Sequence, residues 1–189
     1  MLRYLGNMSA QNPFFHVSLA IALGFFASGA SAASLDTLYD QLKAANEAEA
    51  PKVAAEIEAE WDRSGSAAMD LLLQRGRAAL AEGDYETAIA HLTALIDHAP
   101  DFPEGWSVRA QAFYQEGLLG PALDDIAHVL TLDPRHYTAV VGLGTILEEV
   151  ERPEDAIRAY QEALAIHPYL DGIEEAIDRL RVDADGQNI

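Results

Sequence analysis

A period of 34 residues runs through the middle of this chain and limits the folds open to it. Five columns of matching residues share this spacing. The columns are Pro100, Pro134 and Pro168; Ala88, Ala122 and Ala156; Gly76, Ala110 and Gly144; Leu72, Trp106 and Val140; and Leu92, Ile126 and Tyr160. A fixed period of about 20–50 residues is typical of stacked arrays of supersecondary units. The sequence therefore predicts three copies of one small unit, at residues 69–102, 103–136 and 137–170.

The first copy predicts two helices joined by a tight turn. Ile89, Leu92 and Ile96 recur at spacings of three and four, which gives the second helix an apolar stripe. Gly83 ends the first helix, because glycine readily adopts the left-handed turn conformation. Asp84 follows it and can cap the second helix. The closing proline of each copy then turns the chain into the next copy.

The other two copies vary this turn. In the third copy Glu151 replaces the glycine, and Pro153 supplies the helix start from a first-turn position. In the second copy Gly120 and Pro121 predict that the second helix starts a little later than in the other copies.

These columns resemble the tetratricopeptide repeat (TPR) family in their small-residue pair, the turn sequence "GDYETA" and the closing proline. The main departures are Arg75 and Arg109, where family members often carry leucine. An arginine there can lay its stem on the core and leave its head at the surface. The resemblance implies an all-α fold, a right-handed α-solenoid of helix-turn-helix TPR units.

Both flanks of the array predict further helices. Residues 33–66 predict an N-terminal helical hairpin, Leu35–Ala45 and Pro51–Trp61, as a degenerate repeat or cap that covers the first repeat. Ala54 in this hairpin lies 34 residues before the first alanine of the column. Residues 171–182 predict a C-terminal cap helix with an apolar stripe, and residues 183–189 a flexible polar tail.

The N-terminal segment predicts export. Arg3 is followed by the apolar run Val17–Ala27 and then by Ala30-Ser31-Ala32, which fits signal peptidase cleavage before Ala33. Residues 1–32 are thus expected to be a cleavable signal peptide of a bacterial periplasmic protein, with no stable membrane span after cleavage. The alternative is an uncleaved N-terminal membrane anchor that holds the protein facing the periplasm.

The charge is strongly acidic and argues against several partners. The 189 residues carry 31 acidic and 12 basic side chains, a net charge of −19. All the acids lie after residue 33, so loss of the segment with its single Arg3 would leave −20. Such a surface repels nucleic acid and favours solubility or basic partners. The acidic run from Glu47 to Glu60 is interpreted as a solvated helix face, with a basic-partner site as the alternative.

The sequence contains no recognisable catalytic set. There is no cysteine, no Gly-x-Ser-x-Gly and no phosphate-binding glycine loop. His91 and His98 share a helix face, but no acidic ligand at a suitable spacing accompanies them. We therefore expect no catalytic residues, metal or cofactor, and a non-catalytic protein–protein interaction module. The alternatives are a homo-oligomeric assembly factor and a metal-binding or enzymatic protein with an unrecognised site.

The resemblance to the TPR family implies a concave groove, lined by the first helix of each repeat, for a peptide or a partner helix. Nine residues on one face of these helices are its expected lining: Leu73, Arg77, Leu80, Ser107, Gln111, Tyr114, Val141, Thr145 and Glu148. TPR co-chaperones that hold a C-terminal carboxylate use several cationic and amide residues there, whereas Arg77 is the only cation in this set. We therefore expect recognition through apolar contacts and amide hydrogen bonds.

Overall fold

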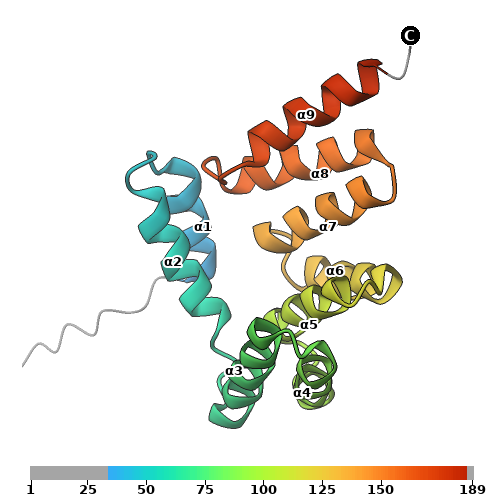
Figure 1. The fold of residues 1–189 in the computed structure, drawn as a ribbon. Helices are drawn as coiled ribbons and strands as arrows, with labels where there is room; N and C mark the ends of the chain where they lie inside the picture. Colours follow the sequence, from blue (N-terminus) through green and yellow to red (C-terminus); the bar gives the residue numbers. More distant parts are fainter. Residues whose placement is uncertain (1–33, 187–189) are drawn as a thin grey trace, which may run out of the picture. The chain divides into compact units, whose positions relative to one another are not determined.

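The computed structural model describes residues 34–186, and all regular structure within that range is helical (Figure 1). This confirms the all-α fold class. The signal peptide expected at residues 1–32 lies outside the described residues. The helices are α1 (Leu35–Ala44), α2 (Ala50–Trp61), α3 (Ala67–Glu82), α4 (Tyr85–His98), α5 (Pro103–Gln115), α6 (Leu119–Leu132), α7 (Tyr137–Glu149), α8 (Pro153–Ile166) and α9 (Ile173–Gly186).

The hairpins α3–α4, α5–α6 and α7–α8 repeat with strict spacing. Their second helices begin at Tyr85, Leu119 and Pro153, which are 34 residues apart. The later start expected for the second copy is therefore wrong. Pro121 is the third residue of α6, within the first turn, where a backbone N–H has no partner inside the helix. Proline at this position costs the helix no hydrogen bond.

The three turns within the repeats have one backbone conformation, although only two of them contain glycine. The φ angles are 78° at Gly83, 78° at Gly117 and 57° at Glu151. Glu151 donates its N–H to the Glu148 carbonyl at 3.0 Å, as Gly83 donates to Leu80 at 3.1 Å. A side chain in this left-handed region costs about 1–2 kcal/mol. The third repeat therefore keeps the turn at a cost in stability. In the first repeat Asp84 caps α4, as expected, by accepting from a backbone N–H through its side chain.

The column of small residues allows the two helices of a repeat to approach closely. A Cβ atom added to Gly76 would lie 2.6 Å from Cγ of Leu92. One added to Gly144 would lie 2.5 Å from Cε1 of Tyr160. Both distances are shorter than a van der Waals contact, so the spacing of these helices depends on glycine.

The apolar face of the N-terminal hairpin packs against the third repeat and not against the first. Apart from its contacts with α2, α1 has its main contacts with α8, and Figure 1 shows one end of α8 next to the hairpin. Leu42 and Ile57 are completely buried in a cluster that also contains Tyr137 from the start of α7. The expectation that this hairpin covers the first repeat is therefore wrong. The side chains of α1 and α2 that should form such a cap are buried against the third repeat.

The last helix, α9, packs on α8. Ile177 and Leu180 are each 5% exposed and belong to one cluster with Tyr160. The helix continues to Gly186, so the first four residues of the expected tail are helical. The remaining residues, 187–189, lie outside the described part.

Among residues 34–186, no helix has both the length and the apolar character needed to cross a membrane.

Candidate functional site

A cleft of about 350 Å³ opens between α5 and α7, and we call it the α5–α7 cleft. Its lining combines apolar, amide and hydroxyl side chains, and none of the lining residues is charged. Five of the nine residues expected from the sequence line it: Leu80, Ser107, Gln111, Tyr114 and Thr145. The first helices of adjacent repeats thus bring together a surface that suits apolar contacts and neutral hydrogen bonds.

The polar groups of this cleft differ in their availability. Gln111 is exposed, whereas Ser107 is only 4% exposed. The Thr145 hydroxyl already donates to the Val141 carbonyl at 3.1 Å. Burial and a hydrogen bond to Glu149 raise the pKa of the Tyr114 hydroxyl. The side chains best placed to meet a ligand are therefore Gln111 and Tyr114.

Three of the other expected residues are engaged by neighbouring helices. Leu73 is 2% exposed and belongs to the core of the first repeat. Val141 packs with the cluster formed by α8 and α9. Both oxygens of Glu148 accept from Arg179 on α9, at 2.6 and 3.2 Å, and these bonds lower the pKa of Glu148. These side chains hold the array together and are not open groove surface.

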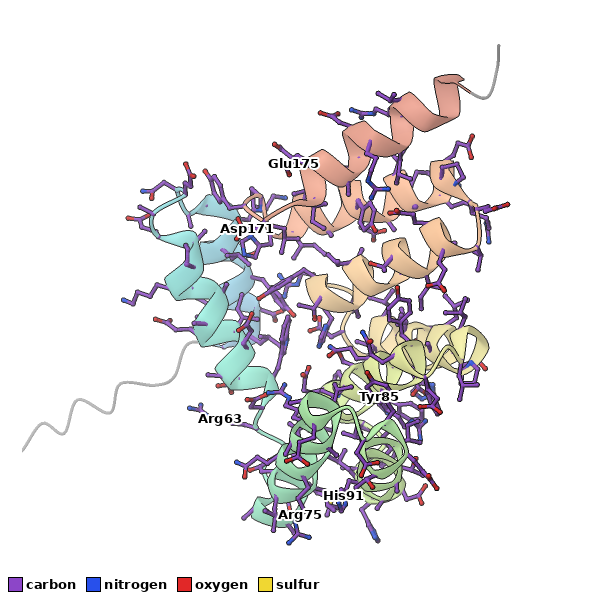
Figure 2. The ribbon with its side chains drawn as sticks, in the orientation of Figure 1. Arg63, Arg75, Tyr85, His91, Asp171 and Glu175 are labelled. Carbon is purple, nitrogen blue, oxygen red and sulfur yellow. The ribbon has the colours of Figure 1, made fainter. Side chains whose placement is uncertain are left out.

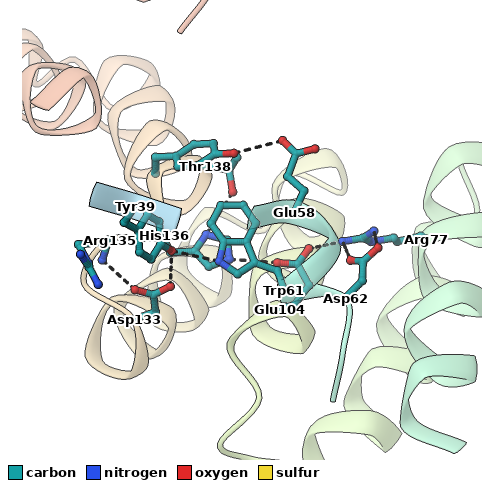
Figure 3. Close-up of polar contacts among 11 residues, drawn as sticks. Tyr39, Glu58, Trp61, Asp62, Arg77, Glu104, Asp133, Arg135, His136 and Thr138 are labelled. Carbon is teal, nitrogen blue, oxygen red and sulfur yellow. Dashed lines mark hydrogen bonds and ion pairs between the residues drawn. The ribbon is translucent and has the colours of Figure 1, made fainter. Parts of the chain in front are cut away.

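Arg77 is paired within the chain. Its Nη1 donates to Oδ2 of Asp62 at 3.0 Å, and its Nη2 bonds to the carboxylate of Glu104 (Figure 3). Glu104 is 5% exposed, and its second oxygen lies 3.0 Å from Nε2 of His136. The one cation of the expected groove is thus neutralised by two carboxylates before any partner arrives.

A second cleft of about 400 Å³ surrounds this ion pair, and we call it the Arg77 cleft. One of its walls is formed by Glu58 of α2 and by Asp62, the C-cap residue of that helix. Gln111 and Thr138 line both clefts, so the two adjoin. The N-terminal hairpin therefore forms one side of the candidate site.

Aromatic stacking and buried hydrogen bonds hold this hairpin in place. The Trp61 ring stacks on His136 with centroids 3.9 Å apart and planes 6° from parallel (Figure 3). Trp61 Nε1 donates to the Tyr39 hydroxyl at 3.1 Å, and that hydroxyl donates to Asp133 at 2.5 Å. Burial, with the hydrogen bond to Asp133, raises the pKa of Tyr39. On the other side, the Tyr137 hydroxyl donates to Glu58 at 3.2 Å.

The sequence predicted that the head groups of Arg75 and Arg109 lie at the surface. Arg75 is exposed, but for Arg109 the expectation is wrong. The Arg109 side chain is 14% exposed, and its guanidinium makes two 2.8 Å bonds to buried Asp125. A charge at a leucine position is tolerated because its partner is supplied from α6.

The histidines considered for metal binding, His91 and His98, both lie on α4. Within residues 34–186, no group of three or more histidine, aspartate or glutamate side chains is arranged to hold a metal ion. His98 is exposed and His91 is partly buried, both on α4.

The fold and the clefts together define a helical-hairpin repeat protein. A family profile described as tetratricopeptide repeat matches residues 73–127 and 121–171. A TPR repeat-containing protein of Rhizobium etli is 34% identical over 143 residues, covering 75% of this chain and 70% of that protein. The chain belongs to the tetratricopeptide repeat family.

Solved structures show the same fold. The Sgt2 TPR domain of Aspergillus fumigatus has a TM-score of 0.61 at 24% identity, covering 65% of this chain and 83% of that domain. The second TPR domain of human RPAP3, in complex with the HSP70 peptide SGPTIEEVD, has a TM-score of 0.54 at 21% identity, covering 57% and 90%. The chain spans only 28% and 25% of two longer relatives, so it matches part of each.

Proposed function

We propose that this chain is a non-catalytic interaction module that binds a peptide or a partner helix in the α5–α7 cleft. The uncharged cleft, with exposed Gln111 beside Tyr114, is the observation that carries the proposal. A pocket of this kind binds by apolar contact and uses a few polar groups for orientation. The peptide complex of the human RPAP3 domain supports the same use of this fold.

Photo-crosslinking in cells tests this proposal. A photoreactive amino acid is placed at Gln111, and in a matched control at Arg75, an exposed residue of α3 that projects away from the helices (Figure 2). We expect one discrete crosslinked product from position 111 and none from position 75. The product should disappear when Tyr114→Ala is added. Equal products from both positions would place binding outside the cleft.

We also propose that the protein acts in the bacterial cell envelope, exported to the periplasm after removal of residues 1–32. The apolar segment and the small residues before Ala33 support this. Mass spectrometry of the protein recovered from the periplasmic fraction should find an N-terminus at Ala33. Intact protein in the membrane fraction would instead indicate an N-terminal anchor, and intact protein in the cytoplasm would contradict export.

A further inference from the structure

The two adjoining clefts carry more acidic than basic charge. Glu58, Asp62 and Glu104 line the Arg77 cleft against the single Arg77, and the α5–α7 cleft adds no charged residue. A partner in the joined clefts therefore meets a site with a net charge of about −2, within a chain whose net charge is −19.

The three carboxylates of this site differ in whether a positively charged partner lies beside them. Glu104 accepts from Arg77 and faces His136, and Asp62 pairs with Arg77. Glu58 differs, because among the described residues its carboxylate accepts a hydrogen bond only from the neutral Tyr137 hydroxyl. The ion pairs of the described residues include no cation at Glu58, which is exposed. Glu58 is therefore the carboxylate that can accept a charge from outside.

We infer that the joined clefts take a basic, partly apolar segment of a partner protein, with an apolar side chain in the α5–α7 cleft and a lysine or arginine facing Glu58. This rests on the proposed function, because it assumes that the α5–α7 cleft is the docking surface. A cation beside Glu58 is stabilised by electrostatic attraction to the surrounding carboxylates. The net negative charge of the chain also speeds its association.

An acidic segment would be disfavoured in the same place. The cation that could receive it, Arg77, already has two carboxylate partners, and buried Glu104 would lose its arginine partner if Arg77 moved. Like charge at Glu58 would add repulsion. The peptide of the human RPAP3 complex, which ends in Glu-Glu-Val-Asp, is thus of the type that this site should reject.

Selection from a random dodecamer display library on the immobilised full chain tests the inference. The negative control is Gly142→Phe, whose ring would fill the α5–α7 cleft. A Cβ at Gly142 lies at an ordinary 3.5 Å from Ile126, so the backbone has room for a side chain there, and circular dichroism checks that the variant is folded. We expect peptides enriched on the unmodified chain over this control to carry lysine or arginine together with apolar residues.

Affinity measurements on the most enriched peptide test whether its basic residue lies beside Glu58. Glu58→Gln keeps an oxygen for the Tyr137 hydroxyl and should weaken binding by about 3- to 5-fold at low salt. The matched control Glu56→Gln removes an equal charge from exposed α2 surface outside the clefts and should change binding by less than about 1.5-fold. Circular dichroism checks that each variant is folded.

The outcomes separate the two proposals. Enriched peptides that are acidic or uncharged would overturn the basic-segment inference and leave the cleft as a docking site. Equal losses from Glu58→Gln and Glu56→Gln would overturn the assignment to Glu58, because only general charge would matter. No enrichment over Gly142→Phe would overturn the proposed function itself.

Discussion

Replacing Trp61 by alanine should release the N-terminal hairpin while the three repeats stay folded. Trp61 is 7% exposed, stacks on His136, packs against Tyr137 at a centroid distance of 4.9 Å and bonds to Tyr39. Burial of about 200 Å² of indole at ~25 cal/mol/Å² amounts to about 5 kcal/mol, an upper estimate. Measured losses for tryptophan-to-alanine changes in cores are about 3–5 kcal/mol. We therefore expect the hairpin to lose about 3–4 kcal/mol of stability.

Hydrogen–deuterium exchange resolved by peptide measures this loss where it occurs. A decrease of 3–4 kcal/mol corresponds to an exchange rate about 150- to 1000-fold faster in α1 and α2. Peptides from α5 and α6 should keep their protection, because their own buried clusters do not include the hairpin. The control Trp106→Ala, on α5, should loosen the second repeat and leave α1 and α2 unchanged.

Two results would refute this reasoning. Unchanged protection of α1 and α2 in Trp61→Ala would mean that the stacking on His136 does not hold the hairpin. A uniform loss of protection over the whole chain would mean that hairpin and repeats form a single cooperative unit.

Three further substitutions and a change of pH test other parts of the structure. Glu151→Gly should stabilise the third repeat by about 0.5–1 kcal/mol in urea unfolding, because relief of the left-handed backbone exceeds the entropy cost of glycine. Gly144→Ala should destabilise by about 1 kcal/mol through its 2.5 Å approach to a ring, whereas Gly142→Ala should stabilise by about 1 kcal/mol through helix propensity. Burial raises the pKa of Tyr39 and of Tyr137. The free energy of unfolding should therefore stay constant below pH ~10 and fall above it, by up to about 1.4 kcal/mol per pH unit for each tyrosine. Urea unfolding midpoints measured from pH 9 to 11 would show this fall.

The repeats could be predicted from the sequence because each column has a local role. Gly76 must be small because its partner Leu92 lies on the other helix of the same hairpin, sixteen residues away. The prediction went wrong at Pro121, where a proline was taken to delay the helix although the first turn requires no N–H. The left-handed backbone conformation of Glu151 could not be predicted either, because glutamate disfavours it and the turn imposes it.

The candidate site could be predicted only in part, because the Arg77 cleft depends on contacts between residues that the 34-residue period does not connect. Gln111 and Tyr114 follow from helix geometry alone, and they line the cleft. The partners of Arg77 are Asp62 at the C-cap of α2 and Glu104 in the first turn of α5, and nothing in the repeat columns connects them. Trp61 ends a helix that the sequence predicts, but the sequence does not reveal that its ring packs on His136 and Tyr137.

The docking of the hairpin on the α6–α7 turn and the third repeat has a consequence for the order of assembly. Tyr39 and its acceptor Asp133 are 94 residues apart, and Asp36 and Arg135 are 99 residues apart. At about 5–20 residues added per second, the hairpin waits some 5–20 s during synthesis before its docking surface exists. The repeats contact mainly their neighbours and can form in sequence as they appear. The earliest of the described helices to emerge, α1 and α2, should therefore be among the last to reach their final place.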